Sequence, residues 1–362
     1  MRKILLLTKT ILVSGALFAQ DASDSLSRNE EKKALTLSGS ADVYYKYDFA
    51  GTRTNSFTSF TQTQNQFALG MASIKASYTL KKVSMVADLG FGQRAKDFAY
   101  TDEGITQAIK QLYISYSPAE HLTLTAGTWA THVGYEVVDP QNNRNYSMSY
   151  MFTNGPFSHT GVKAEYTTGK QGFMVGVSNP ADYRIVPDNK INRKSLIAQY
   201  SYAPSDAFKL YLNYVGGKTV DTSRSDQVDL AATGKLSNKF SLGLNATYAS
   251  VCLWNSTTQK NDTGKPWWGT ALYLNYDPAQ WCGITLRNEL FNDHNHLKSL
   301  GTTAAGDNIF ASTLTASFKK AGFVFMPEIR WDHVNKKALF TDNNQHATAN
   351  DWNVLFAAIY SF

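Results

Sequence analysis

The sequence contains little that would support a helical membrane protein or an enzyme. Only 43% of its 362 residues are hydrophobic, and after residue 20 no window is apolar enough for a membrane-spanning helix. It carries no Gly-x-Ser-x-Gly nucleophile motif, no phosphate-binding glycine loop and no dinucleotide fingerprint. We therefore expect neither catalysis nor a bound cofactor.

Two short clusters of Asp and His are the remaining catalytic or metal-binding alternatives. Asp293, His294 and His296 form one cluster, and Asp332 with His333 forms the other. Each lies at or beside a predicted exposed loop, and a local His-x-His pair without further ligands is too common to indicate a metal site. We therefore predict no metal site.

Residues 1–20 have the three zones of a secretory signal peptide. Arg2 and Lys3 precede an apolar stretch that ends in small residues, which predicts cleavage near Ala19 or Gln20. Because this stretch is shorter than the about 20 residues of a membrane-spanning helix, an uncleaved anchor is the weaker alternative.

The charge of the mature chain gives no argument for nucleic-acid binding. Loss of Arg2, Lys3 and Lys9 lowers the formal net charge from +6 to +3, so the basic character comes partly from the signal peptide. The charged segment 21–33 that follows is too short to form a plug domain inside a barrel. We expect it to be a short periplasmic tail.

Apolar and polar residues alternate from residue 34 to the C-terminus. This period of two predicts amphipathic strands, each near the about 9 to 11 residues that a tilted strand needs to cross a bilayer. Sixteen segments show it: 34–48, 66–80, 83–94, 106–117, 121–131, 158–167, 171–178, 194–203, 206–217, 226–236, 239–251, 267–276, 281–291, 307–318, 322–332 and 351–362.

The connections between these segments alternate between short and long. The short ones carry Pro, Asp, Asn, Ser, Gly or Lys, and several are typical of tight turns: 81–82, 117–120, 168–170, 203–206, 237–238, 277–280 and 319–322. The others are long and polar: 49–65, 95–105, 132–157, 179–193, 218–225, 252–265, 292–306 and 333–350. This asymmetry predicts an all-β fold over residues 34–362, a transmembrane antiparallel up-and-down β-barrel of about 16 strands with periplasmic turns and outer loops.

Aromatic residues form two bands at the predicted strand ends. One band lies near the short turns and the C-terminus: Tyr78, Tyr116, Tyr166, Tyr202, Phe208, Phe240, Tyr276, Trp281, Phe318, Phe323 and Tyr360. The other includes Tyr45, Phe91, Tyr248, Trp268, Trp331 and Trp352. A soluble β-sandwich or propeller would also use aromatic residues, but two bands are typical of the girdles of a membrane barrel.

The last predicted strand ends the chain on Phe362 and places aromatic and apolar residues on one face. Such a strand is similar to the assembly signal that outer-membrane proteins present to the barrel insertion machinery. The signal peptide, the hairpin rhythm and the segments Asn145–Tyr150 and Phe157–Gly161 resemble the OmpL-like outer-membrane β-barrel porins of Gram-negative bacteria. The resemblance implies passive diffusion of small hydrophilic solutes or ions and no catalysed reaction. By analogy with sixteen-strand porins, it also suggests a homotrimer.

Charged residues lie on the face opposite the predicted lipid-facing side. They are Asp42, Lys46, Asp88, Arg94, Lys163, Glu165, Lys209, Asp229, Lys235, Arg287, Glu289, Glu328, Arg330 and Asp332. Since a Lys or Arg facing lipid at mid-membrane costs about 2–4 kcal/mol, this many charges predict water on the inner side.

Some of these charges are candidates for the pore lining. The strongest candidates are Arg287 with Glu289, and Glu328 with Arg330 and Asp332; Asp88 and Arg94 are further candidates. Two interpretations stay open: a wall of opposed charges that orients water and polar solutes, or salt bridges that stiffen the barrel.

The connection 132–157 is the longest and is rich in Asn, Tyr, Met and Phe. Our hypothesis is that it folds into the lumen and narrows the channel, with Arg144, Asn145, Tyr146 and Tyr150 near the constriction. An outward loop shaped by neighbouring subunits is the alternative.

Two function classes follow from these patterns. One is a water-filled diffusion porin in the outer membrane. The other is an outer-membrane barrel with a closed lumen whose loops bind a surface ligand. Cys252 and Cys282 are predicted at opposite ends of their strands, too far apart for a disulfide.

Overall fold

The computed structural model describes residues 34–298, 308–335 and 339–362. The predicted signal peptide (1–20) and tail (21–33) lie outside the described residues. Among the described residues, no helix has the length and apolar character needed to cross a membrane.

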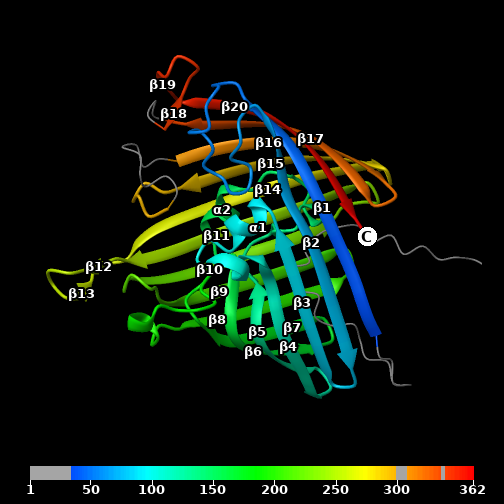
Figure 1. Ribbon diagram of the computed structural model, residues 1–362, viewed down its shortest axis with the longest axis vertical. Helices are drawn as coiled ribbons and strands as arrows, with labels where there is room; N and C mark the ends of the chain where they lie inside the picture. The colour runs from blue at the N-terminus through cyan, green and yellow to red at the C-terminus, as the bar shows by residue number, and fades with distance from the viewer. Residues whose placement is uncertain (1–33, 299–307, 336–338) are drawn as a thin grey trace, which may run out of the picture.

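Sixteen antiparallel strands form a closed barrel (Figure 1). The strands are β1 Ala34–Asp48, β2 Gln66–Leu80, β3 Val83–Phe91, β4 Ile109–Ala119, β5 Leu122–Ala130, β6 Ser158–Thr168, β7 Gln171–Ser178, β8 Ser195–Ser205, β9 Phe208–Lys218, β10 Arg224–Lys235, β11 Phe240–Cys252, β14 Lys265–Ala279, β15 Cys282–Asn292, β16 Asn308–Lys320, β17 Phe323–Val334 and β20 Asn350–Ser361. Each strand pairs with its neighbour in the chain, and β20 closes the ring on β1. The predicted fold class is confirmed.

The alternation of side chains explains why these segments form a barrel wall. On β7, Phe173, Val175 and Val177 face outward and are 48%, 55% and 47% exposed. Met174 and Ser178, between and beside them, face inward and are buried. An outer surface covered by large apolar side chains needs lipid around it, so the barrel spans a membrane.

The aromatic residues near the short turns lie on this outer surface. Tyr116, Tyr166, Trp281, Phe323 and Tyr360 are all more than 40% exposed. At the other end of the strands, Trp331 and Trp352 stack with ring centroids 5.7 Å apart. The rings thus lie at both rims of the barrel, where an amphipathic side chain can contact lipid and water at once.

The third strand is shorter than predicted, because a glycine ends it. Strand β3 ends at Phe91, and Gly92 adopts φ +120°, a conformation that side chains other than glycine rarely adopt. A Cβ there would lie 2.6 Å from the carbonyl oxygen of Gly70. Helix α1 (Gln93–Phe98) follows, so the prediction that Arg94 lies on a strand is wrong.

The loops contain short elements that the alternation did not predict. Three are 3-10 helices, η1 Gly104–Ala108, η2 Pro140–Asn142 and η3 Asp188–Lys190, and one is helix α2 Tyr150–Asn154. Two-residue hairpins project from two outer loops, β12 Trp254–Asn255 with β13 Lys260–Asn261, and β18 Phe340–Thr341 with β19 Ala347–Thr348. Cys252 and Cys282 are both free.

Candidate functional site

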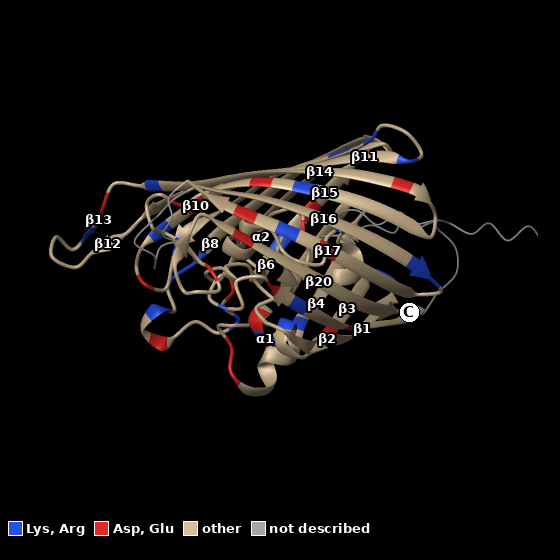
Figure 2. Cartoon of the chain, turned by 90° about the horizontal axis from the view of Figure 1, so that it is seen from above, with Lys and Arg blue, Asp and Glu red and all other residues tan. Residues whose placement is uncertain are grey.

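The connection between β5 and β6, residues 131–157, lies inside the barrel. We call it the inner loop. Helix α2, which belongs to it, lies within the outline of the barrel in both Figure 1 and Figure 2. Its residues hydrogen-bond to inward-facing side chains of β1, β10, β15, β16 and β17. The segment therefore folds into the barrel, as the hypothesis of an inward loop predicts.

Hydrogen bonds within the inner loop shape its backbone, in addition to its contacts with the wall. The Asn143 side chain donates to the Val137 carbonyl (2.6 Å) and accepts from the Val137 N–H (3.0 Å), which closes the segment around Pro140. Ser149 caps α2 by accepting the N–H of Phe152 at 3.1 Å. These contacts give an irregular backbone a defined shape.

Arg287 on β15 binds the inner loop through both terminal nitrogens of its guanidinium. Its Nη1 donates to Glu136 Oε1 (2.6 Å) and to the Ser147 carbonyl (2.7 Å). Glu289, two residues further along β15, accepts the Tyr150 N–H at 2.8 Å. All of these side chains are buried, so each charge must be neutralised by its partners.

Strand β17, which is separated from β15 by β16, binds the same part of the loop. Glu328 accepts the N–H groups of Tyr146 (3.0 Å) and Ser147 (3.2 Å). Arg330 donates to the Met148 carbonyl at 2.9 Å and forms an ion pair with Asp332, also at 2.9 Å. The charged residues on this wall thus satisfy the backbone of a segment that has no strand partner.

Arg94 enters the same region from helix α1. Its guanidinium lies between two rings, 4.9 Å from the Phe60 centroid and 4.7 Å from that of Tyr146. Tyr146 in turn donates its hydroxyl hydrogen bond to Asp42 on β1. A cation between two aromatic faces, with a carboxylate nearby, explains how a fully buried Arg is stable here.

On the third side of the loop, Lys110 joins the barrel wall to Asp139. Its ammonium lies 3.1 Å from Asp88 and 2.5 Å from Asp139. Asp88 was expected to face the lumen, and it does so as one half of a buried ion pair.

The loop reaches furthest toward the short turns at Arg144 and Asn145. Asn145 donates to Thr315 Oγ1 on β16 at 2.6 Å. Arg144 makes a bidentate pair with Asp277 on β14, at 2.7 and 3.0 Å, and its side chain keeps 12% exposure.

The eleven pore-lining candidates thus gather around the inner loop. Ten are buried, namely Asp88, Arg94, Asn145, Tyr146, Tyr150, Arg287, Glu289, Glu328, Arg330 and Asp332, and Arg144 is partly exposed. Most of their hydrogen bonds go to the inner loop or to one another. Wall salt bridges describe only part of this network, because Arg287, Glu328 and Arg330 also bind backbone groups of the inner loop.

Sequence reasoning missed Glu136, Asp139 and Lys110. A signal was present, since Glu136 and Asp139 are the only acidic residues in a loop otherwise rich in aromatic residues and amides. The buried Glu136 and the partly buried Asp139 need cationic partners, and the wall supplies Arg287 and Lys110.

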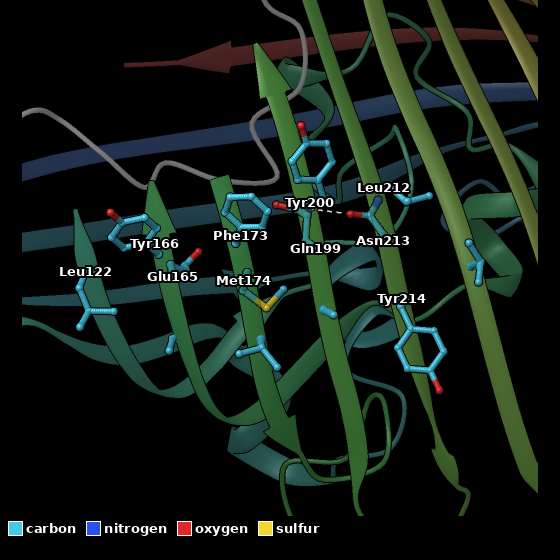
Figure 3. A pocket seen from close by; sticks show the side chains of 14 residues that line it. Leu122, Glu165, Tyr166, Phe173, Met174, Gln199, Tyr200, Leu212, Asn213 and Tyr214 are labelled. Atoms are coloured by element: carbon cyan, nitrogen blue, oxygen red, sulfur yellow. Dashed lines mark hydrogen bonds between the residues drawn. The ribbon is translucent and has the colours of Figure 1, made fainter. Parts of the chain in front are cut away.

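Neutral polar side chains face the inner loop from the opposite wall. Gln199 on β8 donates to Asn213 on β9 at 2.7 Å (Figure 3). Asn213 in turn donates to Asp229 on β10 at 2.9 Å. Asp229 also accepts the Gly134 N–H at 2.9 Å. Burial lowers the pKa of His132, at the start of the loop, to about 4, which keeps this imidazole neutral.

The hollow drawn in Figure 3 belongs mainly to the outer surface. Its volume is about 580 Å³, and its lining includes Leu122, Tyr166, Phe173 and Leu212. These side chains are exposed or half-buried on the lipid-facing side. The hollow is therefore part of the membrane-facing surface.

The two Asp and His clusters have structural contacts in loops and strand ends. Asp293 accepts the N–H groups of Leu297 (2.8 Å) and Lys298 (2.9 Å), which closes a turn. His294 and His333 hydrogen-bond to asparagine side chains. Over the described ranges, no three His, Cys, Asp or Glu side chains are placed to share a metal ion.

A family model described as beta-barrel porin-2, OmpL-like, matches residues 34–362, which is the whole barrel. The chain belongs to this family. It is an outer-membrane porin, and the family and its structural neighbours are channels rather than enzymes. No protein of the curated set matches the chain.

Solved outer-membrane channels share this porin's fold at low sequence identity. The channel DcaP of Acinetobacter baumannii has a TM-score of 0.61 and 11% identity, over 91% of this chain and 97% of that one. OmpT of Vibrio cholerae in a trimer form has a TM-score of 0.56 and 10% identity, over 91% of this chain and 99% of that one. An anion-selective porin from Comamonas acidovorans has a TM-score of 0.58 and 10% identity, over 91% of this chain and 100% of that one. At such identities the likeness shows the fold alone.

Proposed function

We propose that this porin passes small hydrophilic solutes and ions by passive diffusion, and that the inner loop sets the narrowest cross-section. The observation that carries this proposal is the anchoring of the loop backbone by Arg287, Glu289, Glu328 and Arg330. A segment fixed in this way divides the lumen, so solutes pass between the loop and the wall.

Among the candidate residues, Arg144 is the one we assign to the solute path. The other ten are buried within the loop or against it, whereas Arg144 stands at the end of the loop nearest the short turns and keeps 12% exposure. Its pair with Asp277 fixes the guanidinium in place, which suits a residue that defines a rim.

Liposome swelling tests whether the lumen conducts. We expect liposomes that contain the porin to swell in small sugars and to exclude larger ones. A barrel with a closed lumen, which would serve as a surface-ligand-binding protein, passes none of them.

Deletion of residues 142–152 tests the role of the inner loop. We expect a several-fold larger single-channel conductance in planar bilayers. Deletion of 256–259, the tip of the β12–β13 hairpin, is the matched control and should leave conductance unchanged. Equal conductance of wild type and the 142–152 deletion would reject the inner loop as the constriction.

We further propose assembly as a homotrimer, inserted through the last strand. OmpT of Vibrio cholerae, which shares the fold, has a trimer form. Phe362 exchanges backbone hydrogen bonds with Gly39 at 3.0 and 3.1 Å, so the proposed insertion signal lies at the seam of the barrel. Cross-linking in native membranes tests the trimer, and loss of membrane insertion on deletion of Phe362 tests the signal.

A further inference from the structure

On the outer face of β15, the side chain of Asn288 has no hydrogen-bond partner among the described residues. Asn288 lies between Arg287 and Glu289, which both point inward and bind the inner loop. Because successive side chains of a strand alternate between its two faces, the Asn288 amide points outward, to the side that faces lipid. An amide on this side is an exception on an apolar wall.

Asn288 lies at the middle depth of the apolar belt. It is opposite Leu272 on β14, and Leu272 is four residues from Trp268 in one aromatic band and four from Tyr276 in the other. The next outward residue of β15 on the loop side is Leu290. At this depth the bilayer has neither water nor lipid headgroups that could hydrogen-bond to the amide.

Two hydroxyl groups lie beside the amide on the same outer face. Ser312 on β16 is directly opposite Asn288, and Thr270 on β14 is diagonal to it. Neither hydroxyl is hydrogen-bonded within the part of the chain that the structure describes. The three strands lie side by side in Figure 1 and Figure 2. We call Thr270, Asn288 and Ser312 the polar patch.

Other polar side chains on the outer face have partners in their own chain. Asp226 on β10 accepts from the Tyr214 hydroxyl at 2.7 Å and from Arg224 at 2.6 Å. The hydroxyls of Thr128 and Thr160 lie 2.8 Å apart. The polar patch differs from these groups because its amide, with two donor hydrogens and an acceptor oxygen, stays unsatisfied within one subunit.

A second feature weakens the wall next to the polar patch. The pairing of β16 with β17 is interrupted between Thr315–Glu328 and Phe318–Phe325, and Pro327 lies in this gap. Proline has no N–H, so inside a sheet it removes a ladder hydrogen bond. The outer face of β15–β17 thus combines an unsatisfied amide with a break in strand pairing, and a protein packed against this face would stabilise both.

We infer that the polar patch contacts a second copy of this chain, at the subunit interface of the porin. The inference rests on the proposed homotrimer and specifies which face of the barrel meets its copies. Lipid chains offer no hydrogen-bonding group, whereas a neighbouring subunit does. An amide both donates and accepts, so Asn288 is complementary to its own copies, and three amides can close a ring around a threefold axis.

Asn288→Leu tests the contact, because it keeps an apolar volume and removes the amide. We expect subunit association to weaken about tenfold or more, seen on gels run at graded temperatures as earlier separation of the trimer into folded monomers. Tyr214→Phe is the matched control, because it removes an outward hydroxyl that has a partner in its own chain, and it should leave the trimer unchanged.

The opposite outcome is equally well defined. If the Asn288 amide faces lipid, Asn288→Leu removes an unfavourable polar group. The trimer then separates at the wild-type temperature and the barrel becomes more resistant to urea. This result would overturn the inference.

Cysteine cross-linking locates the contact directly. In a chain with Cys252→Ser and Cys282→Ser, Asn288→Cys should form a disulfide between two copies on oxidation in native membranes, because copies near the axis bring the α-carbons within about 4.4–6.8 Å. Val175→Cys, on the outer face of β7 six strands away around the ring, is the control and should form none. A disulfide to a different protein, or none at position 288, argues against a second copy.

This inference and the proposed homotrimer fail in different ways. If wild type gives no oligomer on cross-linking in native membranes, the homotrimer is rejected, and the interface with it. If wild type forms a trimer and both Asn288 variants behave like their controls, the trimer stands and its interface lies on another face. Heat-dependent migration on gels shows whether each variant forms a folded barrel.

Discussion

The wall around the inner loop and the strand ends next to the short turns contain the same kinds of charged residues in different surroundings. Around the loop, Arg287 is fully buried and its partners lie within hydrogen-bond distance. At the strand ends, Lys235 and Lys319 are exposed. The difference shows that burial, more than residue type, decides how much a lumenal charge contributes to holding the structure together.

Removal of a buried cation should have the largest effect. Arg287→Leu leaves Glu136 without its cation and takes one from Glu289, and we expect a loss of about 3–5 kcal/mol in the free energy of unfolding. The measurement is urea-induced unfolding of the barrel in detergent micelles.

Arg224→Ala is the control for this loss. Arg224 is 50% exposed in its pair with Asp226, so its removal should cost less than about 1 kcal/mol. Equal losses in the two variants would show that burial does not separate the two regions.

The pH dependence of stability gives a second test of the effect of burial, through a buried carboxylate outside the strands. Asp182 accepts the N–H groups of Phe157 and Ser158 and the Tyr100 hydroxyl, and burial raises its pKa to about 6. This folded-state pKa lies above the ordinary value of 3.8. The protonated Asp182 carboxyl therefore contributes to the free energy of unfolding at low pH. About 3 kcal/mol of this contribution is lost as pH rises from about 4 to about 6.

Asp182→Asn should remove this pH dependence. The amide does not titrate, and its oxygen can still accept both backbone N–H groups. We expect the apparent melting temperature of wild type to fall more than that of the variant between pH 4 and pH 7. Parallel curves for the two proteins would argue against the raised pKa.

Loss of one buried hydrogen bond should have a smaller effect. Tyr146→Phe removes the hydroxyl that binds Asp42, while Arg94 keeps its stacking on the ring. We expect a cost of about 1–3 kcal/mol and noisier single-channel currents, because the inner loop loses one anchor. Unchanged stability and quiet currents would show that this anchor is dispensable.

Loss of an exposed charge at a strand end should have the smallest effect on stability. Lys235→Gln changes an exposed side chain, and we expect a shift within about 0.5 kcal/mol in the free energy of unfolding. A large loss of stability would place Lys235 with the structural charges instead.

The strands could be predicted almost to the residue where local patterning controls them. The segments 66–80 and 171–178 coincide with β2 and β7, because each alternates cleanly and ends at a turn. The prediction of 83–94 was too long, since the alternation continues past Gly92 while the backbone turns there. A backbone conformation imposed by a neighbouring strand leaves no periodic signal.

The candidate site could be predicted only in part. The wall charges were recognised because they lie on the polar face of the alternating strands, but their partners were not. Glu328 binds backbone 181 and 182 residues away in the chain, and Arg287 meets Glu136 across 151 residues. No local pattern relates positions so far apart.

The sequence by itself determined the barrel of this porin, because period-two alternation and alternating connection lengths are local properties that a lipid environment converts into a closed sheet. Tertiary structure alone decided what the lumenal charges do. Closure of β20 on β1 and the inward fold of residues 131–157 bury some charges and leave others in water. Burial depends on what packs against a side chain, and that is fixed only when distant segments meet.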